Sequence, residues 1–400
     1  MNTLNGAVNR GRPVHPAIVH FALAVGGFAI GTTEFATMSL LPYFSRDLGV
    51  DAPTAGHVIS AYALGVVIGA PLLAVLSARM ARRTLLMLLM GLFALGNGLS
   101  GIAPDYATLL LFRFLSGLPH GAYFGIAMLV AASVVPENQR TRAVGNVLLG
   151  LTVATIVGVP LANWLGQHSS WRLGFGIVAA LALLTVALVA LFAPRDRADP
   201  AASPLRELGA LQRPQVWLTL GIGAVGFGGV FAVYTYLAST LLSVTAVSPD
   251  HIPWVLAAFG VGMTAGNIIV PRFADRALMR TAGILLLCSA SLLALYSFVA
   301  TNFWLLTLDV FGIGLGCALG TVLQTRLMDV AGDAQSLAAA LNHSAFNFAN
   351  ALGPWLGGLA IAAGYGLVST GLVGCALALG GFVIWTVAVW QPRSRSLGVA

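Results

Sequence analysis

The chain alternates between long apolar stretches and short polar separators, and this alternation predicts its architecture. A helix needs roughly 20 apolar residues to cross the hydrocarbon core of a bilayer. Twelve stretches meet this requirement, and their separators carry helix-breaking residues such as Pro104, Pro136 and Pro249. The predicted spans are residues 17–41, 55–77, 84–103, 107–133, 143–166, 173–193, 215–241, 252–271, 281–300, 303–325, 336–362 and 367–390.

The longest polar interval of the chain, residues 194–214, separates six predicted spans from six others. It carries four arginines and three acidic residues near the middle of the 400 residues. We therefore expect two six-helix bundles that are joined by a cytoplasmic connector and flanked by polar tails. The expected segments are an N-terminal tail (1–16), an N-terminal bundle (17–193), the connector (194–214), a C-terminal bundle (215–390) and a C-terminal tail (391–400).

Composition supports a membrane protein. Apolar residues make up 58% of the chain and charged residues only 8%, with a mean hydropathy of +0.90. A soluble domain carries about a quarter charged residues, so the solvent of this chain is expected to be lipid. The three cysteines lie in apolar runs, which favours small hydrophobes over a disulfide framework or a metal site. No cofactor, metal or nucleic-acid partner is expected, although the net charge is +7.

The arginines predict the orientation of the spans. All 20 basic residues are arginines, and 17 of them fall in cytoplasmic segments if the N-terminus lies inside. Arg46 and Arg172 fall in outer loops, and Arg113 lies within a span. Because positive residues concentrate on the cytoplasmic side, both termini are expected to be cytoplasmic.

The two halves also resemble one another at the level of sequence. A shift of 197 residues places Gly65, Gly69, Arg79 and Arg83 on Gly262, Gly266, Arg276 and Arg280. In the fourth span of each half, Gly117, Gly121 and Gly125 match Gly312, Gly316 and Gly320 at a shift of 195. Two parallel six-span halves are the symmetry of a secondary transporter that works by rocking.

Three charged residues lie within predicted spans, namely Glu34, Arg113 and Asp309. Such charges are costly and usually functional. At a rise of about 1.5 Å per residue, all three fall in the outer half of the membrane. We expect Glu34 to carry a proton and Arg113 to tune its protonation, with Asp309 as a further proton-coupling candidate. The alternatives are that Glu34 and Arg113 only hold helices together and that Asp309 is a solvated residue at a helix end.

Polar and aromatic side chains within the spans are candidates for a substrate cavity. An aromatic and amide mixture suits a moderately apolar small-molecule substrate that needs a few hydrogen bonds. Packing within the bundle is the alternative role for each of them. The candidates are Tyr62, His120, Tyr123, Asn146, Tyr234, Gln324, Phe346 and Asn347.

Two arginine-rich segments at the cytoplasmic ends of spans are candidate gating loops. They contain Arg79, Arg82 and Arg83 after the second span, and Asp275, Arg276 and Arg280 after the eighth. Clustered arginines are also the ordinary signal of a cytoplasmic loop. Topology does not require Asp275, which is expected to form an ion pair with the other half that breaks on rocking.

Helix bends are expected at equivalent places in the fifth and eleventh spans. They are marked by Gly158 and Pro160 in one half and by Gly353 and Pro354 in the other. Proline frees a backbone carbonyl and bends a helix, which suits a moving seam. Tolerated irregularity is the alternative.

No enzyme motif stands out. The chain has no GxxxxGK[ST] phosphate loop and no nucleophile–base set or metal-spaced cluster. Transport energy is therefore expected from an ion gradient, in which one charge crossing ~100 mV yields about 2.3 kcal/mol.

Several motifs resemble those of the major facilitator superfamily, and within it the twelve-span drug:proton antiporters of the arabinose-efflux-permease-like, YdhP-type branch. The matching segments are Gly31–Phe35, Ser60–Gly65, Pro119–Gly125, Gly158–Leu161, Trp171–Arg172, Tyr234–Tyr236 and Ala345–Asn347. The resemblance implies an all-α membrane protein with twelve transmembrane helices in two pseudo-symmetric six-helix halves. It also implies that Arg113, with Gly117, is tied to proton coupling. Ala78 and Ala81 depart from the aspartate and glycine that the family has in the loop after span 2.

The expectation is a proton antiporter of the bacterial inner membrane, a monomer that exports small organic molecules by alternating access. Its partners are a small-molecule substrate, protons and the lipid bilayer. A facilitator or importer of sugars or nucleosides, or a membrane receptor that transports nothing, is the alternative. Members of this branch differ in substrate among sugars, nucleosides and drugs, so the substrate does not transfer.

Overall fold

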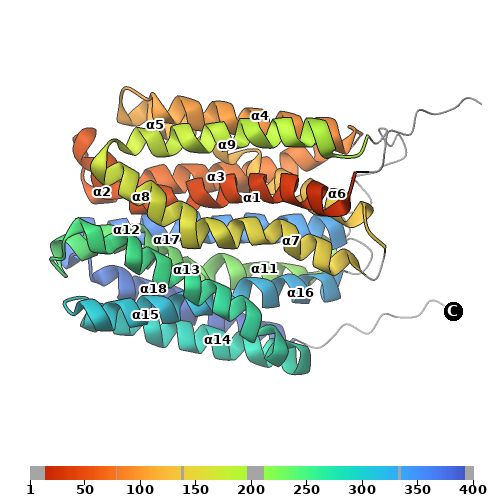
Figure 1. Ribbon diagram of the computed structural model, residues 1–400. Helices are drawn as coiled ribbons and strands as arrows, with labels where there is room; N and C mark the ends of the chain where they lie inside the picture. The colour runs from red at the N-terminus through yellow and green to blue at the C-terminus, as the bar shows by residue number, and fades with distance from the viewer. Residues whose placement is uncertain (1–13, 78, 137–138, 196–210, 332–334, 392–400) are drawn as a thin grey trace, which may run out of the picture.

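The computed structural model describes residues 14–77, 79–136, 139–195, 211–331 and 335–391, and this part of the chain is helical with no β-strand (Figure 1). The predicted all-α membrane fold is confirmed. Most of the N-terminal tail and of the connector, residues 1–13 and 196–210, lie outside the described residues, as do residues 392–400. The domain boundaries that fall there remain predictions.

The first six crossings use helices between Pro16 and Phe192. Three of these crossings consist of more than one helix: α2 follows the end of α1, a break at Leu118–Pro119 separates α5 from α6, and a π turn separates α7 from α8. The elements are α1 (Pro16–Ser39) with α2 (Leu41–Asp47), α3 (Ala52–Leu76), α4 (Arg82–Gly101), α5 (Tyr106–Gly117) with α6 (His120–Ser133), α7 (Arg140–Val153) with the π turn η2 (Ala154–Gly158) and α8 (Val159–His168), and α9 (Trp171–Phe192).

The second six crossings use helices between Pro214 and Trp390. Two of them are again divided in the middle. The elements are α11 (Pro214–Gly226) with α12 (Gly228–Ser243), η4 (Pro249–His251) with α13 (Ile252–Ile269), α14 (Pro271–Val299), α15 (Phe303–Gly316) with α16 (Leu319–Ala331), α17 (Gln335–Ala360) with the π turn η5 (Ile361–Tyr365), and α18 (Ser369–Trp390).

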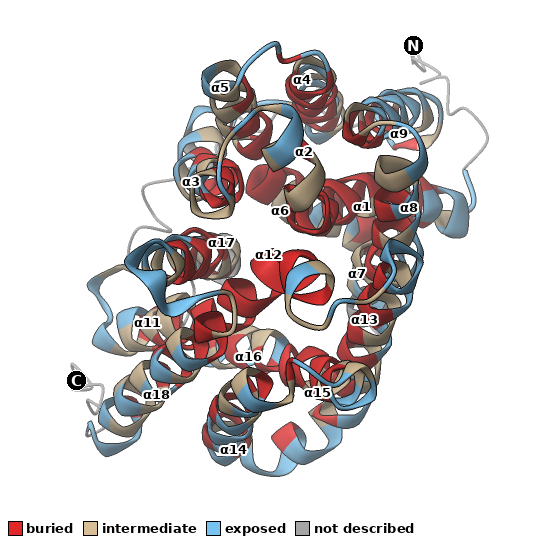
Figure 2. Cartoon of the chain, turned by 90° about the vertical axis from the view of Figure 1, so that its left-hand side faces the viewer, coloured by how far each residue is buried: buried red, intermediate tan, exposed pale blue. Residues whose placement is uncertain are grey.

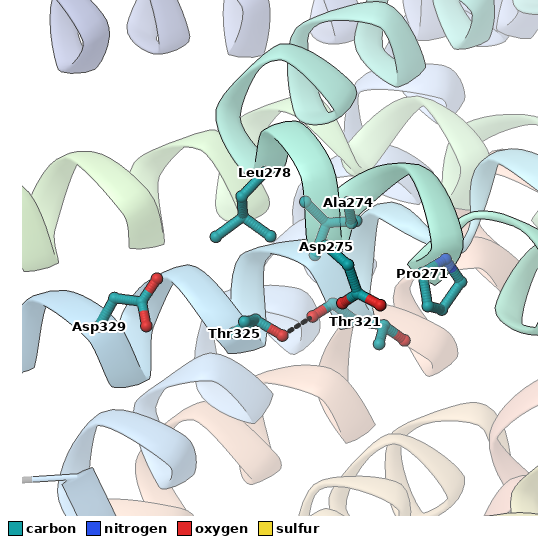
Figure 3. Close-up of a pocket in the computed structure, with 8 residues that line it drawn as sticks. Pro271, Ala274, Asp275, Leu278, Thr321, Thr325 and Asp329 are labelled. Carbon is teal, nitrogen blue, oxygen red and sulfur yellow. Dashed lines mark hydrogen bonds between the residues drawn. The ribbon is translucent and has the colours of Figure 1, made fainter.

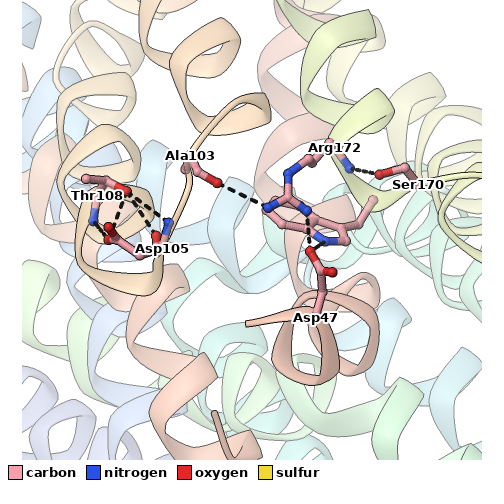
Figure 4. A network of polar contacts seen from close by, with 7 residues as sticks. Asp47, Ala103, Asp105, Thr108, Ser170 and Arg172 are labelled. Carbon is pink, nitrogen blue, oxygen red and sulfur yellow. Dashed lines mark hydrogen bonds and ion pairs between the residues drawn. The ribbon is translucent and has the colours of Figure 1, made fainter. Parts of the chain in front are cut away.

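Helix starts follow from local sequence signals. Pro16 occupies the first turn of α1, where its missing N–H costs nothing. Asp105 caps α5 by accepting a hydrogen bond from the Thr108 backbone at 2.9 Å, in a capping box with the Thr108 side chain (Figure 4). Asn302 caps α15 in the same way through its side-chain oxygen.

Within the described residues, 11 helical segments are long and apolar enough to cross a membrane. They correspond to 11 of the predicted spans, and the remaining predicted span, 336–362, corresponds to α17. This helix has 26 residues but is less apolar, because it carries Asn342, His343, Asn347 and Asn350. The most polar crossing is thus one that lies at the boundary between the two halves.

The outer surface of the bundle is apolar. Figure 2 shows that exposed residues face outward and buried residues face the interior. Large hydrophobic side chains are open on this surface, among them Phe298 (78% exposed) and Trp390 (86% exposed). A soluble monomer rarely exposes such continuous apolar surface, whereas a protein surrounded by lipid does.

Figure 2 views the bundle from the end at which α1 finishes, and we call this the distal end. We call the opposite end, at which α1 begins, the terminal end. Helices α1–α9 form one half and α11–α18 form the other. Along one side the halves meet where α3 packs on α17, and along the other where η2 and α8 pack on α13. We call this boundary the seam.

Close helix contacts follow the sequence repeat, with one correction. A Cβ on Gly65 or Gly69 would collide with backbone near the end of α5, and a Cβ on Gly262 or Gly266 would collide with α15 backbone, so the shift of 197 describes equivalent contacts. The glycines of the fourth span that match at a shift of 195 do not make equivalent contacts in the two halves. Gly117 packs on the Tyr62 carbonyl of α3, whereas Gly312 and Gly316 face side chains of α14. Gly314, which packs on the Phe259 carbonyl of α13, takes the place of Gly117.

The segment after the eighth span also differs from expectation. The arginine pattern places residues 272–280 in a loop, but α14 begins at Pro271 and contains Asp275, Arg276 and Arg280. Ala277 interrupts the helix with φ −156° and ψ 73°. The connection between α13 and α14 is therefore shorter than the arginine pattern indicates, and the chain changes direction at the Ala277 kink within α14.

Candidate functional site

Glu34 lies in the interior of the protein at the seam. The second half of α1 is buried on nearly every side, and Glu34 itself is 8% exposed. Its Oε1 accepts a hydrogen bond from Asn350 Nδ2 of α17 at 3.1 Å. A carboxyl group of one half is therefore held directly by an amide of the other half.

Arg113 lies in the same region but forms no ion pair with Glu34 within the described residues. Its Nη1 donates to Thr33 Oγ1 at 3.0 Å and to Asn97 Oδ1 at 3.3 Å. The guanidinium carbon lies 4.3 Å from the centre of the Tyr62 ring, in cation–π geometry. The side chain is 1% exposed, so its charge is compensated by neutral oxygens and an aromatic face. Thr33 links Arg113 to the residue next to Glu34.

His120 extends this cluster toward the other half. Its Nδ1 is 2.9 Å from the Tyr62 hydroxyl, and its ring centre is 6.4 Å from that of His343 on α17. His343 stacks on Phe124 of α6 with parallel rings whose centres are 5.5 Å apart. Tyr62 and His120 of the predicted cavity are thus brought together, and Phe124 and His343 complete a second contact across the seam.

An aromatic layer closes the seam toward the distal end. Phe35 of α1 meets Phe231 and Tyr234 of α12, with ring centres 6.3 and 5.7 Å away, and Tyr234 packs on Phe259 at 4.3 Å. Phe346 packs on Phe227 at 4.7 Å within the second half. Tyr234 therefore joins the seam, whereas Phe346 has its aromatic partner in its own half.

Three other predicted cavity residues form their hydrogen bonds within their own half. Tyr123 donates to the Leu23 carbonyl at 2.7 Å in the first half, and Gln324 accepts from Asn342 at 2.6 Å in the second. Asn347 donates from its Nδ2 to the His343 carbonyl of its own helix at 3.0 Å. A role for these side chains in binding substrate remains a prediction.

Asn146 faces a lateral groove between α1 and α7. Its Nδ2 lies 3.3 Å from His20 Nδ1, and His20 Nε2 lies 3.2 Å from the Ala131 carbonyl. Because that carbonyl only accepts, His20 donates to it and accepts from Asn146. The groove has a volume of about 410 Å³ and is otherwise lined by apolar side chains such as Phe21 and Phe28. Asn146 is therefore placed apart from the cluster around Glu34.

Asp309 is also separate from Glu34 and Arg113. It lies on the buried face of α15, which packs against α13 and α14. The side chain is 3% exposed, and among the described residues neither carboxyl oxygen has a hydrogen-bond partner. Such a group is costly when it is charged, so Asp309 remains a candidate for holding a proton.

The predicted gating residues lie near the terminal end. Asp275 lines a pocket of about 260 Å³ with Thr321, Thr325 and Asp329 of α16, all from the second half (Figure 3). Within the described residues it forms no ion pair with the first half, so the expected latch is not formed in this state. Arg83 donates to the Ala190 carbonyl, which ties α4 to α9.

The predicted bends differ in form. Gly158 ends the π turn η2, and Pro160 follows in the first turn of α8. A π turn inserts an extra residue and redirects a helix. Pro354 lies inside α17, and the π turn η5 comes later in the same crossing.

A polar network at the distal end is not evident as a cluster from the sequence. Asp47 of α2 accepts hydrogen bonds from Arg172 and from Trp171 Nε1 of α9, and Arg172 also donates to the Ala103 carbonyl at 3.1 Å (Figure 4). These bonds hold the pKa of Asp47 below its ordinary value, chiefly through Arg172. The network ties α2 to the ends of α4 and α9.

Sequence reasoning also misses Asn97 and Asn350, which hold Arg113 and Glu34. Both are amides in apolar helices and both are fully buried. Their polarity within a span is a signal, but nothing in the sequence tells which charged residue each one meets.

Two similar bundles of membrane-crossing helices, with polar and aromatic side chains along the seam, define a membrane transport protein. The chain belongs to the Major Facilitator Superfamily, whose family model matches residues 23–245 and 227–400. The resemblance seen in the motifs is confirmed.

Among its relatives, the inner membrane transport protein YdhP of Escherichia coli O157:H7 is 41% identical over 377 residues, which cover 93% of this chain and 96% of that protein. A chloramphenicol resistance protein of Streptomyces lividans is 34% identical over 341 residues, which cover 84% of this chain and 86% of that protein. A solved bacterial homolog of the human lysosomal transporter Spinster, inward-facing and unoccupied, shares the fold. Its TM-score is 0.69 at 19% identity, over 94% of this chain and 99% of that one.

Proposed function

We propose that this protein is a proton-driven exporter of small organic molecules in the bacterial inner membrane and that it works by alternating access. The observation that carries the proposal is the buried carboxyl group of Glu34, which lies at the seam and is held by the opposite half. Rare charges within membrane helices commonly serve in ion pathways. A relative that is named a chloramphenicol resistance protein supports export of a small molecule.

In this proposal the terminal end is cytoplasmic and the distal end faces outward. Gln167 of α8 donates to the Pro249 carbonyl at 2.9 Å, and Ser60 of α3 donates to the Ala351 carbonyl at 2.9 Å. Together with the layer around Phe35, these contacts support a state in which the distal side is closed. Rocking of the halves then opens that side and exposes Glu34 to external protons.

The test measures substrate binding and pH-gradient-driven transport by a Glu34→Gln variant in proteoliposomes. The substrate is chosen by a thermal-shift screen of drugs, sugars and nucleosides. The variant is expected to bind substrate but to lose transport driven by a pH gradient, because the glutamine amide does not titrate and so cannot take up and release a proton. Asp105→Asn, at an exposed helix cap, is the control and is expected to transport normally. Unchanged gradient-driven transport in Glu34→Gln would end the assignment.

A further inference from the structure

Asn350 is the direct hydrogen-bond partner of Glu34 within the described residues. It is fully buried on α17, and its Nδ2 donates to Glu34 Oε1 at 3.1 Å. Its own Oδ1 has no hydrogen-bond partner in the part of the chain that the structure describes. The amide can therefore donate to a carboxylate through Nδ2, and after a flip it can accept from a carboxylic acid through Oδ1.

The surroundings of this contact make it sensitive to the seam. The next residue along α17, Ala351, accepts from Ser60 of α3, so this part of α17 is fastened to the first half. Pro354 lies four residues later, and its ring cannot donate a helical hydrogen bond to the Asn350 carbonyl. If the distal side opens, α17 withdraws from α1 and Glu34 loses the amide.

Other charged or titratable groups face Glu34 from the helices around it. Arg113 of α5 and Tyr62 of α3 act on it electrostatically without a direct hydrogen bond. His120 of α6 and His343 of α17 lie beyond Tyr62 in the same cluster. Arg113, Tyr62 and His120 belong to the same half as Glu34, so their positions relative to it change least when the halves rock.

We propose that Asn350 is a positioning residue that makes proton binding by Glu34 depend on closure of the distal seam. The inference rests on the proposed function and deepens it. A donated N–H stabilises the charged carboxylate more than the neutral acid. Closure therefore favours loss of the Glu34 proton to water at the terminal end, and opening favours uptake of a proton from the distal side. By reciprocity, removal of the proton favours closure.

The first experiment follows the carboxylic acid C=O stretch of Glu34 by infrared difference spectroscopy of the reconstituted protein as pH is raised. The band is assigned by its loss in Glu34→Gln. In Asn350→Ala, the pH at which the band is half lost is expected to rise by about one to two units, because a hydrogen bond to a charged group is removed. Ser60→Ala, which removes the neighbouring seam bond, is the matched control and is expected to shift that pH much less, because the Asn350 amide stays in place beside Glu34.

The second experiment measures the seam itself. Spin labels are placed at Ser169 and Ser248, both near the distal end, after replacement of Cys288, Cys317 and Cys375. The distance between the labels is expected to shorten as pH rises in the parent protein and in Ser60→Ala. Asn350→Ala is expected to lose this pH dependence, and a retained dependence would contradict the inference.

A double variant in which the acid and the amide are swapped tests the inference if Asn350→Ala does not fold. Glu34→Gln with Asn350→Asp keeps an amide–carboxyl pair and moves the acid to α17. It is expected to restore a titrating band and pH-dependent closure. An unshifted band in Asn350→Ala, or an equal shift in Ser60→Ala, overturns the inference while the proposed function stands. Normal gradient-driven transport by Glu34→Gln overturns the proposed function by itself.

Discussion

At the scale of single residues, the site depends on how buried charges are compensated. Arg113 is held by Thr33, Asn97 and the face of Tyr62, which suit a planar guanidinium with several donors. Glu34 is held by one amide from the other half. Within the described residues the two charges therefore occupy one cluster without forming a direct pair, which supports the proposed exchange of a proton at Glu34.

Arg113→Lys is expected to reduce gradient-driven transport by about tenfold or more. Lysine keeps the positive charge but lacks the planar guanidinium, which donates several hydrogen bonds and stacks on an aromatic ring. Transport in proteoliposomes measures this effect. Arg172→Lys, at the distal surface, is the control and is expected to retain most activity. Equal activity of Arg113→Lys and the parent protein would contradict the role of the planar group.

The network around Asp47 predicts a pH dependence of stability. Because the pKa of Asp47 is lowered in the folded protein, its contribution is present above the ordinary value of 3.8 and is lost as pH falls through the lower folded value. Asp47→Ala is expected to cost about half a kcal/mol at pH 7, since the pair is largely exposed. Thermal unfolding in detergent should show this difference at pH 7 and a smaller one once the pH has fallen below the lowered pKa of folded Asp47. A difference that grows at low pH would contradict the assignment.

At the scale of elements, glycine decides how closely helices approach. Gly65 and Gly69 allow α3 to meet the end of α5, and Gly262 and Gly266 allow α13 to meet α15. The two helix pairs are equivalent members of the two halves. Close backbone contact at small residues is a common basis of helix association in membranes.

Gly262→Ala is therefore expected to destabilise the protein by about 1–3 kcal/mol, because the new methyl group meets the Phe311 carbonyl. Thermal unfolding in detergent measures the change. Gly91→Ala is the control, since a Cβ there has open space and alanine favours a helix. If both variants unfold alike, the close contact is not what stabilises this pair.

At the scale of the whole molecule, the proposed alternating-access mechanism requires that the seam open and close. The contact between Gln167 and Pro249 joins the halves at the distal end, and the contact of Glu34 with Asn350 joins them in the interior. Both must separate if the distal side opens. The same two bundles can then serve two states with little change inside each half.

Cysteines at Gln167 and Pro249, in a variant without the three native cysteines, are expected to stop exchange when joined by a short thiol crosslinker. Cleavage of a reducible crosslinker should restore transport. A crosslinked pair at Asp47 and Arg172, within one half, is the control and is expected to leave exchange intact. Continued exchange by the crosslinked seam would contradict a rocking mechanism.

The sequence by itself determined the membrane class, the positions of most crossings and the similarity of the halves. These are properties of apolar length, arginine placement and periodic glycine, which act over neighbouring residues. The limits of such reasoning show at α14, where a helix with a kink at Ala277 replaces an expected loop.

Only the tertiary structure decided which of the polar residues meet. Glu34 and Asn350 are 316 residues apart in sequence, and Arg113 meets Asn97 rather than an acid. The structure also separates Asn146 and Asp309 from that cluster. The physical reason is that a span pattern specifies which residues are buried, whereas the packing of one helix on another selects the partner of each buried polar group.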